Sequence, residues 1–198
     1  MQSGYFTMKP DKFIAIDFET ANRNMGSACA IGIVVFQEGV LTYKESFLIR
    51  PHQSLYSFDP SFIDIHHIRP EDVVDQPEFD QLWPMIREII KDGILVAHNA
   101  SFDMTVLMSL ITLYKLEYDH FSYFCSVKLS RSAFKFLPSH RLNVVAEHLG
   151  IHLDHHDAGS DAFACAQIVN QTMILTGIYH PWELCDALMV PIGSSWYL

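Results

Sequence analysis

Short apolar runs fill the first fifty residues of the chain, and their length is that of β-strands. The runs FIAID at 13–17, CAIGIVVF at 29–36 and LTYKESFLIR at 41–50 are rich in β-branched and aromatic residues and predict three strands. Glu38 and Gly39 separate the last two runs, which predicts a tight turn between them. The three strands are therefore expected to form an antiparallel meander.

Apolar residues later in the chain recur every three to four positions, which is the spacing of amphipathic helices. Two apolar runs, 94–97 and 121–125, interrupt this spacing and predict buried strands. The helical spacing covers four segments, 79–90, 104–114, 142–149 and 158–175. Strands followed by helix–strand alternation predict an α/β fold with a mixed five-stranded sheet, an antiparallel meander plus parallel strands, flanked by helices.

No internal repeat, linker or low-complexity tract divides the chain of 198 residues. This length, with 49% hydrophobic and 18% charged residues, predicts one domain with a substantial core. We expect this domain at 11–176. The remaining residues, 177–198, are expected to form a C-terminal tail that packs on the domain or on a partner subunit.

The chain is acidic, because 13 basic and 23 acidic side chains give a formal net charge of −10. This balance argues against a protein that grips long duplex DNA with a broad cationic face. An enzyme that acts on nucleic acid remains compatible with it, since bound metal ions can supply positive charge locally.

Three observations bear on the compartment. The four cysteines are widely spaced and form no CxxC pair, so neither a zinc site nor a disulfide framework is expected. The start, MQSGYFTMKPDKF, lacks the apolar stretch of a secretory signal. Polar residues interrupt the most apolar window, 93–114, which argues against a membrane span. We therefore expect a cytoplasmic protein with no membrane partner.

Asp17 and Glu19 stand two positions apart at the end of the first predicted strand. Side chains at that spacing point to the same face of a strand, so both carboxylates can meet one cation. The apolar residues before them predict a buried setting, in which adjacent anions are costly without a neutralising partner. A solvated strand end is the alternative interpretation of this pair, and these residues alone leave it open.

Further acids are placed where helices begin. Asp103 follows the predicted strand at 94–97 and lies in a first helical turn, where the helix dipole favours a carboxylate. Asp157 precedes the last long helix and has the position of an N-cap. Asp161 opens an otherwise apolar run of that helix, which indicates a partner for its charge.

Carboxylate ligands without a Cys or His cluster select a hard cation, Mg²⁺ or Mn²⁺, over zinc. Four carboxylates can hold two such ions, an arrangement suited to in-line displacement at phosphorus. A histidine that accepts a proton completes such a site. Of the eleven histidines, His156 is the best candidate because it lies five positions before Asp161.

The blocks IDFET at 16–20, HNASFD at 98–103 and HDAGSDA at 156–162 together resemble the motifs of the DEDDh 3′–5′ exonucleases. This DnaQ-like family includes the proofreading epsilon subunit of bacterial DNA polymerase III. The resemblance covers about residues 11–176. It implies a ribonuclease H-like fold and hydrolysis of the last phosphodiester at a free 3′ end, which releases a nucleoside 5′-monophosphate.

The resemblance also implies roles for single residues. His156 would be the general base, and two Mg²⁺ ions, for which Mn²⁺ can substitute, would be held by Asp17, Glu19, Asp103 and Asp161. The candidate substrate contacts are Phe18, Thr20, Ala21, Ile65, His66, Asn99 and Phe102. For Asn99 and Phe102, helix capping and core packing are equally open interpretations. His67 stands where the family's I-H-G-I loop has glycine, so the backbone angles of this loop are in question.

Substrate and partner stay open at this point. We expect a 3′ end of single-stranded or frayed DNA, and RNA is the alternative with the same chemistry, because no residue reports on the 2′-hydroxyl. A further hypothesis is a nucleic-acid-binding module that accompanies a polymerase and no longer cleaves, although the complete set of acids argues against it. A DNA polymerase and a second copy of this chain are the candidate protein partners.

Overall fold

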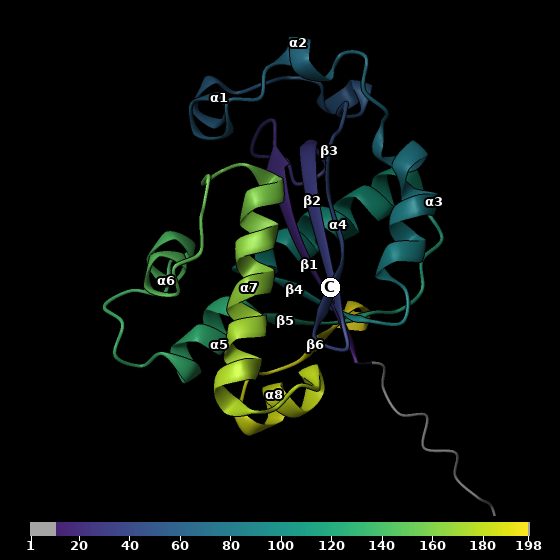
Figure 1. The fold of residues 1–198 in the computed structure, drawn as a ribbon. Helices are drawn as coiled ribbons and strands as arrows, with labels where there is room; N and C mark the ends of the chain where they lie inside the picture. The colour runs from purple at the N-terminus through teal and green to yellow at the C-terminus, as the bar shows by residue number, and fades with distance from the viewer. Residues whose placement is uncertain (1–10, 198) are drawn as a thin grey trace, which may run out of the picture.

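A computed structural model describes residues 11–197 of the protein. Six strands form one mixed sheet in the order β3–β2–β1–β4–β5–β6 (Figure 1). Residues 1–10, where no secretory signal is expected, and Leu198 at the end of the expected tail lie outside the described residues. The strands are β1 (Lys12–Thr20), β2 (Ala28–Gln37), β3 (Val40–Leu48), β4 (Ile94–Ala97), β5 (Ser122–Cys125) and β6 (Gly193–Ser194).

The predicted meander and parallel strands are confirmed. Strand β2 pairs antiparallel with β1 and with β3, whereas β4 runs parallel to both β1 and β5. Glu38 and Gly39 both have positive φ, 52° and 74°, as the tight turn between two twisted strands requires. The sequence predicts five strands, and the structure adds β6, which pairs antiparallel with the edge of β5. A strand of two residues has no alternation from which it could be predicted.

The four predicted helices are present, and the one expected from residue 104 begins earlier, at Ala100. The additional helices are all short, so their hydrophobic period is too brief to recognise. The helices are α1 (Pro60–His66), α2 (Pro70–Val73), α3 (Phe79–Ile90), α4 (Ala100–Tyr114), α5 (Ser126–Ala133), α6 (Leu142–His148), α7 (Ala158–Thr176) and α8 (Pro181–Ala187), with two 3₁₀ turns, η1 (Gln53–Leu55) and η2 (Ser195–Tyr197).

Alternate side chains of β1 serve two cores, one on each face of the sheet. Ile14, Ile16 and Phe18 belong to the cluster that α3 and α4 complete. Phe13 and Ala15 belong to the cluster that α7 completes on the other face. Helix α7 crosses this second face, with α5 and α6 beside it (Figure 1). Strand β1 is therefore covered on both faces, and its end lies next to the start of α7.

Glycine at position 32 allows α7 to approach the sheet closely. A Cβ atom on Gly32 of β2 would collide with the carbonyl oxygen of Ala158, the first residue of α7. The first turn of the helix therefore rests on the backbone of β2 at Gly32, which is the residue that pairs with Asp17.

The residues after α7 pack on the same domain. Leu184 and Cys185 of α8 are fully buried in the cluster that contains α7, and β6 extends the sheet. The four cysteines are free thiols. Within residues 11–197, no helix combines the length and the apolar character that crossing a bilayer requires.

Candidate active site

The first two acids lie on the α7 face of the sheet, where β1 ends. Phe18 between them points to the opposite face, where its buried ring packs against Phe79 of α3. Asp17 and Glu19 therefore share one side, as the strand period predicts. Their ligand oxygens and that of Asp161 all lie within 4.8 Å of one another.

Asp103 reaches this corner from the first turn of α4. Its side chain is 1% exposed, and its Oδ1 accepts a hydrogen bond from the backbone N–H of Phe18 at 3.1 Å. The parallel pairing of β1 with β4 places the start of α4 beside the end of β1. This backbone contact holds the fourth acid next to Asp17, whose protonation it influences directly.

Burial raises the pKa values of all four acids, and the charges of neighbouring acids add to the shift in three of them. Burial raises the pKa of Asp17 well above its usual range, and the charges of Asp103, Asp161 and Glu19 add to this shift. Burial, followed by the charge of Asp161, raises the pKa of Glu19 to about 8. For Asp103 burial raises the pKa to about 7, against the hydrogen bond from Phe18. Burial also raises the pKa of Asp161.

No lysine or arginine among residues 11–197 forms an ion pair with these carboxylates. The two pairs that involve such side chains are Arg50–Glu78 and Arg87–Asp119, which lie on other elements. Clustered carboxyl groups with raised pKa values, and with no lysine or arginine partner in the described part of the chain, are a donor set that suits hard divalent cations.

The third motif is a loop followed by the start of α7. Asp157 is exposed, and its Oδ1 accepts a hydrogen bond from the backbone N–H of Ser160 at 2.8 Å, which is the N-cap geometry that its position predicts. Asp161, one turn further, is 4% exposed and belongs to the carboxylate group. The backbone N–H of His156 donates to Asp161 Oδ2 at 3.3 Å, and His156 has a φ of 72°.

His155 also contacts Asp161, and sequence reasoning missed it. Its Nδ1 lies 2.9 Å from Oδ2 and 3.2 Å from Oδ1 of that carboxylate. Its ring stacks on the ring of His156, with centroids 3.9 Å apart and planes at 13°. The only sequence feature that pointed to His155 is its place beside His156, and two adjacent histidines do not show which ring turns toward Asp161.

Asp17, Glu19, Asp161 and His156 line a cleft of about 590 Å³, whereas the buried Asp103 is not part of its lining. Of the predicted substrate contacts, Phe18, Asn99 and Phe102 also line it, while Thr20, Ala21, Ile65 and His66 do not. Asn99 occupies the N-cap position of α4 with a φ of 75°, yet its side chain makes no capping hydrogen bond. Phe102 is half-buried against the core.

The cleft also contains two exposed arginines, Arg131 and Arg141, which the sequence does not point out. His98 helps to hold the loop that carries Arg141. Its Nδ1 lies 2.8 Å from Ser126 Oγ, and its Nε2 lies 3.0 Å from the carbonyl oxygen of His140. Burial lowers the pKa of His98 to about 4, so this ring is neutral and structural at neutral pH.

The other predicted contacts are mostly enclosed by the protein. Thr20 and Ala21 are buried, and Ile65 is exposed. His66 is 6% exposed. Its Nδ1 accepts a hydrogen bond from the backbone N–H of Ile68 at 3.0 Å, and its Nε2 lies 3.1 Å from the carbonyl oxygen of Thr20. Because Nδ1 is an acceptor, Nε2 carries the proton and donates to Thr20.

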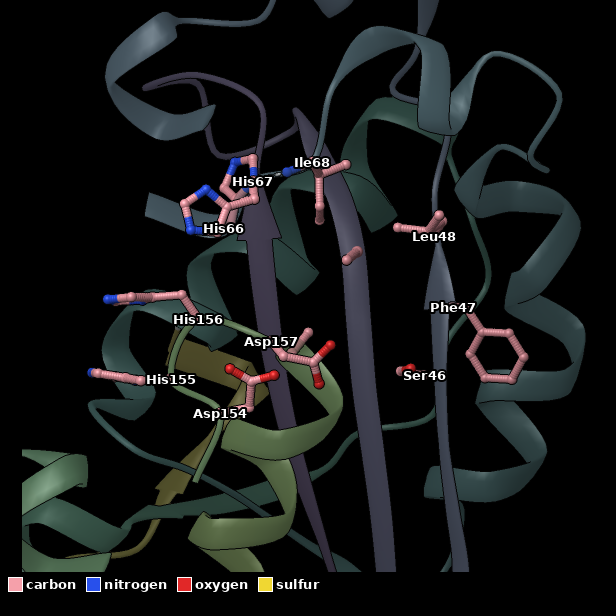
Figure 2. A pocket seen from close by; sticks show the side chains of 12 residues that line it. Ser46, Phe47, Leu48, His66, His67, Ile68, Asp154, His155, His156 and Asp157 are labelled. Carbon is pink, nitrogen blue, oxygen red and sulfur yellow. Dashed lines mark hydrogen bonds between the residues drawn. The ribbon is translucent and has the colours of Figure 1, made fainter. Parts of the chain in front are cut away.

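His67 adopts the backbone conformation that glycine favours. It ends α1 in the left-handed region with a φ of 61°. The loop therefore keeps the backbone conformation that glycine gives the family's I-H-G-I loop, at some cost in strain. His67 is exposed and lines a second pocket of about 280 Å³, between the loop at 66–68 and the loop at 154–157. Figure 2 shows the rings of His66 and His67 above those of His155 and His156. This pocket adjoins the cleft, because both are lined by His155 and His156.

Comparison with known proteins agrees with this geometry. A family model described as "Exonuclease" (RNase_T) matches residues 14–169. Curated relatives include the DNA polymerase III PolC-type proteins of Clostridium perfringens, 29% identical over 167 residues, and of Bacillus cereus, 27% identical over 188 residues. These alignments cover 80% and 93% of this chain but 11% and 13% of the relatives. The chain therefore spans about a tenth of their length.

Several solved structures share the fold. Exonuclease X in complex with 5′-overhanging duplex DNA has a TM-score of 0.67 and 23% identity, over 87% of this chain and 98% of that one. The nuclease domain of 3′hExo bound to rAMP has a TM-score of 0.70 and 19% identity, over 86% and 95%. Product-bound exonuclease I has a TM-score of 0.72 and 17% identity, over 90% and 46%. These neighbours have ribonuclease H-like folds, which confirms the predicted fold class.

Proposed function

The chain belongs to the exonuclease family, as a DnaQ-like 3′–5′ exonuclease of the DEDDh type, and from this premise we propose its reaction. It hydrolyses the terminal phosphodiester of single-stranded or frayed DNA and releases nucleoside 5′-monophosphates. One observation carries the proposal: Asp17, Glu19 and Asp161 gather their ligand atoms within 4.8 Å, and Asp103 is anchored beside them on the Phe18 N–H.

In this proposal Asp17, Glu19, Asp103 and Asp161 are the metal ligands. The family depends on divalent metal ions, and Mg²⁺ is the ion that oxygen ligands of this kind suit best, with Mn²⁺ as a substitute. Two bound ions would neutralise the phosphate, lower the pKa of the attacking water and stabilise the leaving oxygen. The hydrogen bond from Phe18 orients Asp103, and the seating of α7 on β2 brings Asp161 to the same corner.

His156 is proposed as the general base that takes the proton of the attacking water. Its side chain is exposed and lines the cleft. Burial, followed by the nearby His155, lowers the pKa of His156 from its usual value. The ring is therefore neutral at pH 7 and has a nitrogen lone pair available for a proton.

Two arginines are proposed to supply cationic contacts beside the carboxylates. Arg131 and Arg141 line the cleft beyond the carboxylates, and both are exposed. A guanidinium group binds phosphate oxygens in a bidentate manner. We infer that they hold the phosphates of nucleotides next to the scissile bond. Two cations fit a grip on a few terminal nucleotides rather than on a long strand.

The remaining substrate contacts fall into two groups. Phe18, Asn99 and Phe102 line the cleft and are proposed to contact the terminal nucleotide, Phe18 through its backbone because its ring is buried against Phe79. Thr20, Ala21, Ile65 and His66 lie outside the cleft lining, and their proposed contribution is through the backbone at 20–21 and the shape of the loop at 65–68. His66 then acts as a positioning residue, since its ring bridges Thr20 and Ile68.

DNA is the preferred substrate in this proposal, because the curated relatives are DNA polymerase III proteins. RNA is the second candidate, favoured by the structural neighbour that holds rAMP. Rates on matched DNA and RNA oligonucleotides of one sequence decide between them. A DNA rate at least tenfold above the RNA rate supports the first choice, and the reverse ratio supports the second.

The assay that tests the activity uses an oligonucleotide labelled at its 3′ end, with Mg²⁺ and the purified chain. Labelled mononucleotide is expected as the first product, and Asp17→Ala serves as the inactive control. Product formation no faster than with that control would overturn the assignment. Saturable oligonucleotide binding without turnover would instead support the non-cleaving module. A polymerase is the proposed protein partner, on the names of the relatives, with a second copy of the chain as the alternative.

A further inference from the structure

A second group of metal-ligating atoms lies next to the carboxylates, and it has a different chemistry. The ring nitrogens of His155 and His156 and a carboxylate oxygen of Asp161 all lie within 4.8 Å of one another. Two imidazole nitrogens and one carboxylate oxygen form a donor set that suits Zn²⁺ and similar transition metals. The hard oxygen set of Asp17, Glu19 and Asp161 suits Mg²⁺ instead.

The two histidines lie close enough to share an ion once one ring turns, because stacked rings direct their nitrogen lone pairs in parallel. Their rings stack at 3.9 Å with nearly parallel planes, and Figure 2 shows both rings directed to the same side of the loop, away from Asp157. His155 Nδ1 is already 2.9 Å from Asp161 Oδ2. Both histidines are exposed, so an ion from solution can reach them.

We propose that His155, His156 and Asp161 form an inhibitory Zn²⁺ site that excludes the catalytic ions. The two groups share Asp161, so an ion bound by the histidines competes for a carboxylate that the magnesium site needs. The same ion takes up the ring nitrogen of His156, whose lone pair would otherwise accept the proton of water. Three protein ligands would hold the ion, and a site of this kind keeps a further position for water.

Zinc binding is measured first, without reference to activity. The full chain is titrated with Zn²⁺ in competition with a chromophoric zinc chelator. We expect one Zn²⁺ per chain in the wild type, and at least about a tenfold loss of affinity in His155→Gln, because even outer partners of a metal ligand are worth that much. His152→Gln is the matched control: His152 is exposed and lies in the same loop, and it is not one of the three ligands.

Asp17→Asn separates the two groups of ligands. Asp17 belongs only to the carboxylate group, so this variant is expected to bind Zn²⁺ as the wild type does. Equal affinity in wild type and His155→Gln would overturn the proposal, as would a loss in Asp17→Asn alone, which places the ion among the carboxylates. A similar loss in His152→Gln and His155→Gln would also overturn it, because it indicates scattered surface binding.

The inhibitory effect rests on the proposed exonuclease activity and has its own experiment. At fixed Mg²⁺, the Zn²⁺ concentration that halves the rate is expected to rise about tenfold or more in His155→Gln, and to rise in the wild type as Mg²⁺ is increased. Inhibition that is independent of Mg²⁺ and of His155 would overturn the competition. If the chain has no nuclease activity at all, the binding titration still decides whether the zinc site exists.

Discussion

The backbone N–H of Phe18 donates a hydrogen bond to Asp103 Oδ1 at 3.1 Å, although the two residues are 85 positions apart. This contact ties the first turn of α4 to the last part of β1. Asp103 is almost fully buried, so neither partner has water as a substitute. The position of one candidate metal ligand is therefore set by the strand that carries two others.

Substitution of Asp103 separates its charge from its structural contact. Asp103→Asn keeps an oxygen that accepts from Phe18, so we expect a fold of near wild-type stability. Its exonuclease activity should fall by at least about a hundredfold, because even the outer partners of metal ligands contribute about 10–100-fold. Asp103→Ala leaves a buried N–H unpaired and is expected to lose about 1–3 kcal/mol more of the free energy of unfolding. Urea denaturation and initial rates measure the two effects. Equal stability of both variants would contradict the proposed anchoring.

Metal-free protein is expected to lose stability as the pH rises. The folded-state pKa values of Glu19 and Asp103 are raised, to about 8 and about 7, whereas in the unfolded chain such groups titrate near pH 4. The folded state therefore binds more protons between these limits, and its stability falls as the pH rises through 7–8. Thermal melts in chelator across pH 5.5–8.5 test this, and Glu19→Gln should flatten the decline. A melting temperature that rises with pH would contradict it.

Added Mg²⁺ is expected to reverse this loss, most strongly at high pH, because the ligands must be deprotonated to bind it. At a concentration about 100 times the dissociation constant, binding adds about 2.7 kcal/mol. For a chain of this length that corresponds to roughly 5–10 °C in Tm. The same melts with and without Mg²⁺ measure it, and Asp17→Ala is expected to show little gain.

His156→Ala tests the proposed base. Turnover should fall by about 10²–10⁴-fold, the usual contribution of a general base, while Mg²⁺ still binds, because the carboxylate group does not include His156. Single-turnover rates and the Mg²⁺-dependent Tm shift are the two readouts. If the variant also fails to bind Mg²⁺, His156 is a ligand rather than the base.

Removal of Arg131 and Arg141 together should raise KM several-fold and leave kcat nearly unchanged. Each lost phosphate contact also reduces the dependence of log KM on log salt, by about 0.7 per contact for a single strand. Lys128→Ala is the matched control, because Lys128 is exposed on the same helix as Arg131 and does not line the cleft. An equal effect of Lys128→Ala would indicate a general charge effect instead.

Glycine at position 67 is expected to stabilise the chain. His67 has a φ of 61° at the end of α1, a conformation that costs a residue with a side chain about 1 kcal/mol or more. His67→Gly should therefore gain up to about 1 kcal/mol in the free energy of unfolding, whereas His67→Val should lose more than that. Urea denaturation of both variants measures the difference. A less stable glycine variant would show that contacts of the His67 ring outweigh the strain.

Most of the sheet and the candidate metal-ligating acids can be predicted from the sequence, because both depend on the spacing of residues within single strands and helices. Asp17 and Glu19 share a face since strand side chains alternate, and Asp157 caps α7 as its position predicts. The gathering of Asp103 and Asp161 at the end of β1 follows from strand ends and helix starts meeting at one edge of the sheet. Each of these inferences needs only a few neighbouring residues.

Contacts between distant segments could not be predicted in this way. His155 contacts Asp161 in a loop where His156 has a positive φ, and no hydrophobic pattern reports either feature. Arg131 and Arg141 come together in the cleft because the chain between α5 and α6 folds back toward His98. The burial of His66 depends on a carbonyl group of β1, 46 positions away.

The seating of Ala158 on Gly32 has a consequence for how such a molecule can change over time. Helix α7 and strand β2 meet there through peptide groups, so the distance between them is set by the dimensions of the main chain alone. Mutations that enlarge or shrink core side chains leave this distance as it is. The spacing of the carboxylates that would hold the ions can therefore stay constant while the core side chains around them change during evolution. This holds only as long as position 32 remains glycine.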